Sequence, residues 1–136
     1  MEQKQMLKIF TAQYRYSGKN RLDITVKGKD PVGSWFAPTW EMVMKTKKGL
    51  MSKEEYTQEY YRLMRKRYRE NPDIFNDLLK RDEVVFVCFE KPEEGFCHRY
   101  ILANIFTKMG AEYKGELNTD GSFWGEIDLE VFEEPI

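Results

Sequence analysis

Residues 83–110 read EVVFVCFEKPEEGFCHRYILANIFTKMG and contain the two patterns that decide the fold. The first eight residues form a nearly continuous apolar run rich in β-branched side chains. Such a run predicts a strand covered on both faces, as in a parallel sheet. After a short acidic loop, residues 97–109 predict a helix with a buried apolar face and Gly110 as its C-cap. A strand that leads through a loop into a helix is the building block of α/β proteins.

The sequence on either side of this unit contains four more strand patterns. Apolar alternation or clusters of β-branched and aromatic residues predict strands over residues 6–14, 21–28 and 111–117. A further strand, antiparallel to the others, is predicted within residues 123–132, after a turn at Asp120-Gly121.

Three helices are predicted between the second strand and the central one. The first covers residues 39–49, the second begins at Ser52, and the third begins at Pro72. The second is the clearest, because Ser52 and Glu55 form a capping box. Strands that alternate with helices predict an α/β fold. We expect a single domain over residues 1–136, with a mostly parallel central sheet of four to five strands flanked by helices, of the Rossmann-like or flavodoxin-like type.

The composition favours one compact domain. The chain has 136 residues, 41% of them hydrophobic, and a formal net charge of -1. No stretch approaches the roughly 20 apolar residues that span a bilayer, and the start MEQKQMLKIF has no signal-peptide pattern. Two cysteines are too few for a disulfide scaffold. We therefore expect a cytoplasmic protein that has no membrane partner. Nucleic acid is not an expected partner, whereas the high aromatic content is compatible with a homodimer.

The charge is distributed unevenly along the chain. Residues 112–136 contain eight acids and one base, so they carry -7, whereas residues 1–111 carry +6. The acidic end of the domain, from about residue 118, is either an interaction tail or the solvated side of an edge strand with a short polar end. Its aromatic residues favour the second interpretation.

The densest basic run is RLMRKRYR, residues 62–69. Its cations fall on one side of the predicted helix, away from most of the tyrosines. This side is either a nucleic-acid contact or a solvated helix face balanced by nearby acids, and the second interpretation is favoured.

The Cys97-His98-Arg99 triplet stands where the central strand gives way to the next helix. Ligands of open α/β sheets bind at the carboxyl ends of the strands, and a helix N-terminus favours anions. Arg99 can pair with a phosphate or carboxylate through two hydrogen bonds, so the triplet predicts an anion site with Arg99 as its main contact. Structural roles stay open: a buried helix start for Cys97, a cap or acid partner for His98, and a bridge to Glu90 or Glu94 for Arg99.

Cys97 is also a candidate nucleophile, because the helix dipole and a neighbouring cation would stabilise its thiolate. His98 or Glu90 would assist it. Helical geometry weakens this interpretation, since adjacent residues point about 100° apart, and Cys97 and Arg99 about 200° apart. Cys88, inside the strand, is predicted to be plain core. One histidine and two cysteines nine residues apart match no usual zinc spacing, so neither a metal site nor a cofactor is predicted.

The stretch VVFVCFEKPEEGFCHRYILA resembles the domain-of-unknown-function family 488, which typically shows an apolar strand, a short acidic loop and Cys-His-Arg opening a helix. YTQEYYRLMRKR, IFNDLLKRDEV and LDITVKGKDPVGSWFAP are similar to other parts of that family, so the resemblance covers residues 6–117. It implies the fold and a pocket to which Cys97, His98 and Arg99 belong, but no established reaction. Many members of that family carry Asp-x-Arg at the end of the second strand. Here the corresponding residues 26–30, VKGKD, contain Lys27 and Lys29 but no arginine. The positive charge is kept, but the two-bond geometry of an arginine is lost.

Residues after the other strands would join this pocket if the sheet is parallel. Arginine and aromatic side chains suit a phosphate-bearing ligand with a ring, although Trp35 and Phe36 have an alternative role in covering the sheet edge. No complete acid–base or nucleophile set is visible. The favoured function is therefore binding, or sequestering, of a phosphate-bearing or nucleotide-derived molecule. A hydrolase or transferase that depends on Cys97, and a protein- or nucleic-acid-interaction module, are the alternatives. The predicted ligand-binding residues are Arg99, His98, Arg15, Tyr14, Ser34, Trp35, Phe36 and Glu90.

Overall fold

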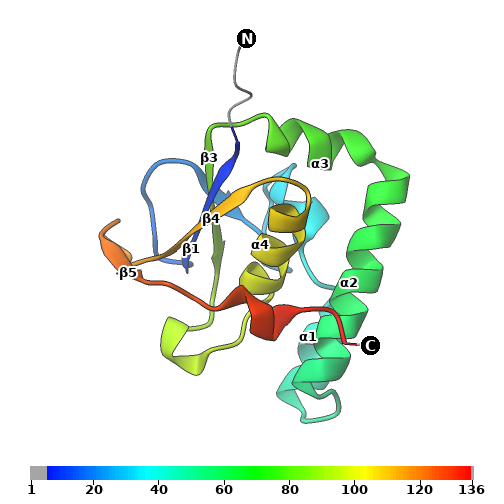
Figure 1. Ribbon diagram of the computed structural model, residues 1–136. Coiled ribbons are helices and arrows are strands. Elements are labelled where there is room, and N and C mark those ends of the chain that lie inside the picture. Colours follow the sequence, from blue (N-terminus) through cyan, green and yellow to red (C-terminus); the bar gives the residue numbers. More distant parts are fainter. Residues whose placement is uncertain (1–5, 136) are drawn as a thin grey trace.

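The computed structural model of the protein describes residues 6–135 and has the predicted α/β architecture, with one five-stranded sheet (Figure 1). The strands are β1 (Lys8–Gln13), β2 (Arg21–Asp23), β3 (Glu83–Cys88), β4 (Glu112–Leu117) and β5 (Phe123–Gly125). Their order in space is β2-β3-β1-β4-β5. The first four of these are parallel, and β5 pairs with β4 in the antiparallel sense. The predicted fold class and the direction of the last strand are confirmed.

Four α-helices connect and cover these strands. They are α1 (Trp40–Lys47), α2 (Lys53–Glu70), α3 (Pro72–Leu79) and α4 (His98–Lys108), with short 3-10 turns η1 (Gly33–Phe36), η2 (Pro92–Glu94) and η3 (Leu129–Phe132). The capping box at the start of α2 is confirmed, because the Ser52 hydroxyl accepts from the backbone N–H of Glu55 and the Glu55 carboxylate accepts from that of Ser52.

The two faces of the sheet are covered by different kinds of structure. Ile9, Val84 and Phe86 belong to the large core cluster, in which buried residues of all four α-helices pack on one face of the sheet. Figure 1 shows these helices on one side of the strands. Val85 lies on the other face, against Tyr16 of the turn that follows β1. β3 is thus buried on both faces, as its apolar run predicts, but a turn and not a helix provides the second cover.

Phe36 is at the centre of the core. Its ring contacts those of Phe75 and Phe106 edge-on, with centroids 5.0 Å and 5.5 Å away, and that of Phe86 at 6.5 Å. Such aromatic pairs contribute about 0.5–1.5 kcal/mol each beyond the area they bury. Gly33 allows this placement, because a Cβ there would overlap the carbonyl oxygen of Asp23. η1 therefore rests directly on the end of β2.

The acidic end of the chain is part of the fold. After the edge strand β5, η3 lies along α4, with Phe132 buried and its carbonyl accepting from the Tyr61 hydroxyl at 2.8 Å. Glu133 and Glu134 then form ion pairs with basic side chains of α4 and α2. These contacts favour the edge-strand interpretation over an interaction tail.

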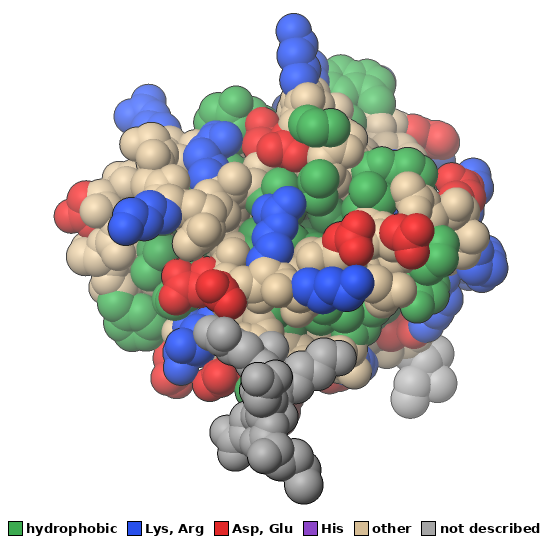
Figure 2. All heavy atoms as spheres, turned by 90° about the horizontal axis from the view of Figure 1, so that it is seen from above, with side chains coloured by type: hydrophobic (Ala, Val, Ile, Leu, Met, Phe, Trp, Pro, Cys, Tyr) green, Lys and Arg blue, Asp and Glu red, His purple; other side chains and the backbone are tan. Residues whose placement is uncertain are grey.

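The surface above the amino-terminal ends of the strands has interspersed charge. Figure 2 shows acidic and basic side chains alternating over this face, without a large area of one sign. None of the described helices is long and apolar enough to cross a membrane.

Candidate functional site

A cleft of about 540 Å³ lies at the edge of the sheet where the parallel strands end. The end of β3 and the start of α4 line it on one side, and α1, the start of α2 and the loop around η2 line the others. Its volume is within the roughly 300–1,000 Å³ of small-molecule sites. Two hollows of similar size lie along α2, but the chemically reactive side chains gather in the cleft at the sheet edge.

Three reactive side chains converge on the wall of this cleft. Cys88 ends β3, Cys97 is the N-cap of α4, and His98 is its first residue; all three are buried. The His98 Nδ1 atom is 3.5 Å from Cys88 Sγ and 3.9 Å from Cys97 Sγ. The two sulfur atoms are joined as a disulfide. We call these residues, with the adjacent Glu90, the Cys-His cluster.

The structure extends one expectation about the cysteines and corrects another. Cys88 belongs to the buried core, as expected, and as the last residue of β3 it also borders the cleft and contacts Cys97. Cys97 does not follow the helical spacing expected for residues 97–109, because its extended backbone (φ -165°, ψ 150°) places it before the helix. Its side chain therefore turns toward the same point as that of His98, although residues adjacent within a helix diverge by about 100°.

A hydrogen bond to the end of β2 orients the His98 ring. Its Nε2 lies 2.7 Å from the carbonyl oxygen of Ile24, which can only accept, so Nε2 carries the proton and Nδ1 presents a lone pair to the sulfurs. The carboxylate of Asp23 accepts from the backbone N–H and the hydroxyl of Thr25, which fixes the turn around Ile24. Burial lowers the pKa of His98 to about 4, so the imidazole is neutral at pH 7.

Glu90 borders the cluster from an exposed position in the loop after β3. Its Oε2 atom is 3.0 Å from Cys88 Sγ and 3.2 Å from Cys97 Sγ. A thiol could donate a proton to this oxygen, whereas a disulfide sulfur has none to donate. The carboxylate is thus placed to interact with the reduced form of the pair.

Arg99 points away from the cleft and is fully buried. Its Nε and Nη2 atoms donate to the two carboxylate oxygens of Glu116 on β4, at 3.2 Å and 3.0 Å. The Tyr100 hydroxyl accepts from Nη2 at 2.8 Å and lies 3.2 Å from Glu116 Oε1. The guanidinium expected as the main anion contact is therefore engaged with an internal carboxylate.

Positive charge reaches the cleft from other residues. Lys27, Lys47 and Lys53 line it, with Lys27 Nζ 4.9 Å from the Trp40 ring centroid and Lys53 Nζ 5.7 Å from that of Phe96. Lys47, Lys53 and Trp40 come from α1 and the start of α2, and they were not predicted because the prediction rested on residues that follow strands. No local signal identifies them, because only the packing of α1 and α2 brings them to the sheet edge.

The remaining predicted site residues do not line the cleft. Tyr14 stacks on Phe89, a cleft residue, with ring centroids 4.6 Å apart, and Arg15 is exposed in the turn beyond it. In η1, Ser34 is exposed and Trp35 is half-buried, and neither side chain lines the cleft. The core position of the next residue, Phe36, removes it from contact with any ligand. Cys97, His98 and Glu90 are the predicted residues that the cleft brings together.

The basic run on α2 is balanced by acids. Arg62, Arg65 and Lys66 form ion pairs with carboxylates of α2 and of the acidic end of the chain. Arg67 points inward and donates to three backbone carbonyls of residues 34–37. This arrangement agrees with a solvated helix face.

Comparison with known families adds to this geometry. Residues 1–110 match DUF488-N3a, described as the active DUF488-N3 subclade, and the match includes the whole Cys-His cluster. Comparisons with curated proteins and with solved structures found no match. The match covers most of the chain and confirms the resemblance carried by the strand, the acidic loop and the Cys-His-Arg triplet. This chain therefore belongs to the DUF488 family, in its active DUF488-N3 subclade.

Proposed function

We propose that this protein binds an anionic, phosphate-bearing small molecule with a ring system, such as a nucleotide-derived compound, in the cleft at the sheet edge. The observation that carries this proposal is the lining of the cleft, where three lysines lie among aromatic rings. A parallel sheet commonly places its ligand at this edge. The fold and the family are compatible with this role, and the side chains of the cleft favour it.

The charge of the cleft favours an anion. Lys27, Lys47 and Lys53 outnumber the acids Glu90 and Glu94. Lysine neutralises phosphate as a mobile point charge and does not impose the two-bond geometry of arginine. The lysines thus replace Arg99 as the expected source of positive charge, and binding should weaken as salt screens them.

The aromatic residues favour a ligand with a ring. Trp40 is 49% exposed and Phe89 is 59% exposed, and both line the cleft together with the lysines, while Tyr14 stacks on one face of Phe89. Phe96 contributes a third ring from the loop before α4. Stacking against a flat ring is compatible with several bases, so we expect the phosphate and the ring to contribute more to binding than any one base edge.

Thermal unfolding with the common nucleoside 5′-monophosphates tests this function. A ligand present at 100 times its Kd adds about 2.7 kcal/mol to the free energy of unfolding, which raises Tm by several degrees. We expect the monophosphates to raise Tm more than the matched nucleosides or inorganic phosphate do. The Lys27→Ala and Lys53→Ala substitutions should each reduce the shift.

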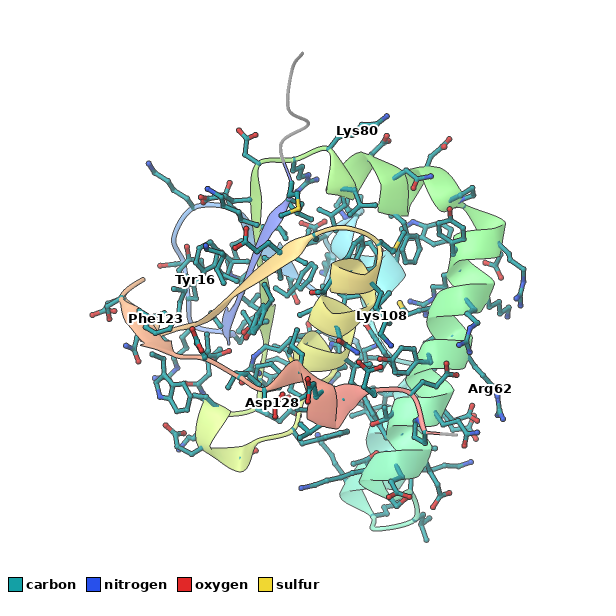
Figure 3. All side chains as sticks on the ribbon, viewed as in Figure 1. Tyr16, Arg62, Lys80, Lys108, Phe123 and Asp128 are labelled. Atoms are coloured by element: carbon teal, nitrogen blue, oxygen red, sulfur yellow. A yellow bond between two sulfur atoms is a disulfide. The ribbon has the colours of Figure 1, made fainter. Side chains whose placement is uncertain are left out.

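The matched control is Lys80→Ala. Lys80 is exposed near the end of α3, at the opposite end of the strands from the cleft (Figure 3), so its removal should leave the shift unchanged. If the ligand raised Tm equally in the Lys27→Ala, Lys53→Ala and Lys80→Ala variants, it would bind outside the cleft. A full absence of stabilisation by phosphate-bearing compounds would contradict the proposal.

A second candidate function is cysteine-dependent hydrolysis or group transfer. It is favoured by the lone pair of His98 Nδ1, which lies 3.9 Å from Cys97 Sγ and could accept the thiol proton in the reduced protein. With the disulfide reduced and a chelator present, iodoacetamide should alkylate Cys97 at least about tenfold faster than in a His98→Asn variant whose circular dichroism is unchanged. Equal rates would count against a nucleophilic Cys97.

A further inference from the structure

We propose that the reduced protein binds one divalent metal ion of the zinc type through Cys88, Cys97 and His98. The ligand atoms would be the two Sγ atoms and Nδ1, which all lie within 4.8 Å of one another. A fourth position would face the cleft that the same residues line. Two thiolates and one imidazole form a donor set suited to Zn²⁺, and three protein ligands with one open position are typical of catalytic zinc sites.

The distances between the donor atoms fit tetrahedral coordination. With Zn–S bonds of about 2.3 Å and Zn–N bonds of about 2.0–2.1 Å, a nitrogen and a sulfur on one ion lie about 3.6 Å apart. The observed Nδ1 to Sγ distances of 3.5 Å and 3.9 Å bracket this value. Only the two sulfurs would have to separate, to about 3.8 Å.

The backbone leaves room for that separation. The Cα atoms of Cys88 and Cys97 are 7.5 Å apart, whereas disulfide-bonded cysteines usually have Cα atoms about 4.4–6.8 Å apart. Rotation of the two side chains could therefore open a gap between the sulfurs without moving β3 against α4.

The ring nitrogen of His98 that faces away from the sulfurs makes the hydrogen bond that metal-binding histidines usually have. Its Nε2–H donates to the Ile24 carbonyl oxygen at 2.7 Å, which selects the tautomer with Nδ1 unprotonated and fixes the ring. In the disulfide form, neither sulfur offers a proton to this buried Nδ1. A metal ion would give Nδ1 and both sulfurs a common partner.

The change from disulfide to metal site balances with a dithiol as reductant. The dithiol gives two electrons and two protons to the Cys88–Cys97 bond, which becomes two thiols, while the dithiol becomes a disulfide. The divalent ion then binds both sulfurs as thiolates, and each thiol releases its proton. Metal binding and disulfide formation are therefore mutually exclusive states of one pair of cysteines.

Titration with Co²⁺ under anaerobic conditions tests the site. The full-length protein is reduced with dithiothreitol, freed of the reductant, and titrated while its absorption spectrum is recorded. We expect one Co²⁺ per chain, with a thiolate-to-cobalt charge-transfer band, the visible bands of tetrahedral Co²⁺, and loss of both on addition of Zn²⁺. The oxidised protein has the same sequence and should show none of these bands.

Two kinds of variant locate the site. Cys88→Ser and Cys97→Ser should each weaken Co²⁺ binding by more than about 100-fold, since even residues that only hydrogen-bond to a metal ligand commonly contribute 10–100-fold. Glu94→Gln removes a nearby cleft carboxylate and should leave binding intact. Absence of one-to-one binding by the reduced wild-type protein would overturn the proposal. So would equal binding by the oxidised protein.

Discussion

His98 and Arg99 are neighbours in the chain, yet they belong to two different regions of the molecule. His98 borders the cleft, where its lone pair faces two sulfurs. Arg99 lies in a closed interior, where its charge is met by Glu116 on β4. Because adjacent residues of a helix diverge by about 100°, one short motif supplies both a chemical group and an internal ion pair. The same motif therefore stabilises the contact between α4 and β4 through Arg99 and positions the Cys-His cluster through His98.

The largest effect is expected for replacement of Arg99, which removes the buried ion pair with Glu116. The Arg99→Met substitution leaves the Glu116 carboxylate buried without its cation, which commonly costs about 3–5 kcal/mol in the free energy of unfolding. Urea unfolding monitored by circular dichroism measures this loss. The double variant Arg99→Met/Glu116→Leu should recover most of it, since an apolar replacement of a buried ion pair is often neutral.

A single variant that unfolds at the wild-type urea concentration would contradict this assignment, because it would mean that leaving the buried Glu116 carboxylate without its cation has no cost. A double variant as unstable as the single one would show instead that shape, and not the unpaired charge, dominates the loss. Arg99 Nη1 has no hydrogen-bond partner within the described residues, so some of its desolvation cost is already present in the wild-type protein.

A smaller effect is expected at His98, and it depends on pH. Burial lowers the pKa of His98 in the folded protein to about 4, against an ordinary value of 6.5. Between these values the unfolded chain binds a proton that the folded protein does not, so the free energy of unfolding falls as the pH falls. The contribution of the neutral His98 to the free energy of unfolding is fully present above pH 6.5, and about 3 kcal/mol of it is lost by pH 4.

Urea unfolding of the disulfide form at several pH values, with a chelator present, measures this slope. The His98→Asn variant should lack the part of the slope that the imidazole contributes, while Arg99→Met should keep it because its guanidinium does not titrate in this range. The same slope in the His98→Asn variant as in the wild-type protein would assign the acid sensitivity to other groups.

The strand–loop–helix unit was predictable because its signals are local. A continuous apolar run, an acidic loop and a helical apolar face indicate β3, the loop and α4 within a few residues of their observed bounds. The capping box at Ser52 was predictable for the same reason. Arg99 was not: its partner Glu116 is distant in sequence, and nothing near Arg99 shows that a buried carboxylate on β4 will meet it.

The amino-acid sequence by itself determined the α/β fold, the order of its main elements and the place of the Cys-His-Arg triplet at the start of α4. Tertiary structure alone decided what each member of the triplet touches. The extended backbone of Cys97 turns its sulfur toward Cys88, and the packing of α1 and α2 brings Lys47 and Lys53 to the cleft. The physical reason is the distance along the sequence over which each kind of interaction acts. Periodicity and capping act over a few residues, whereas a site forms where segments that are distant in sequence share one small volume.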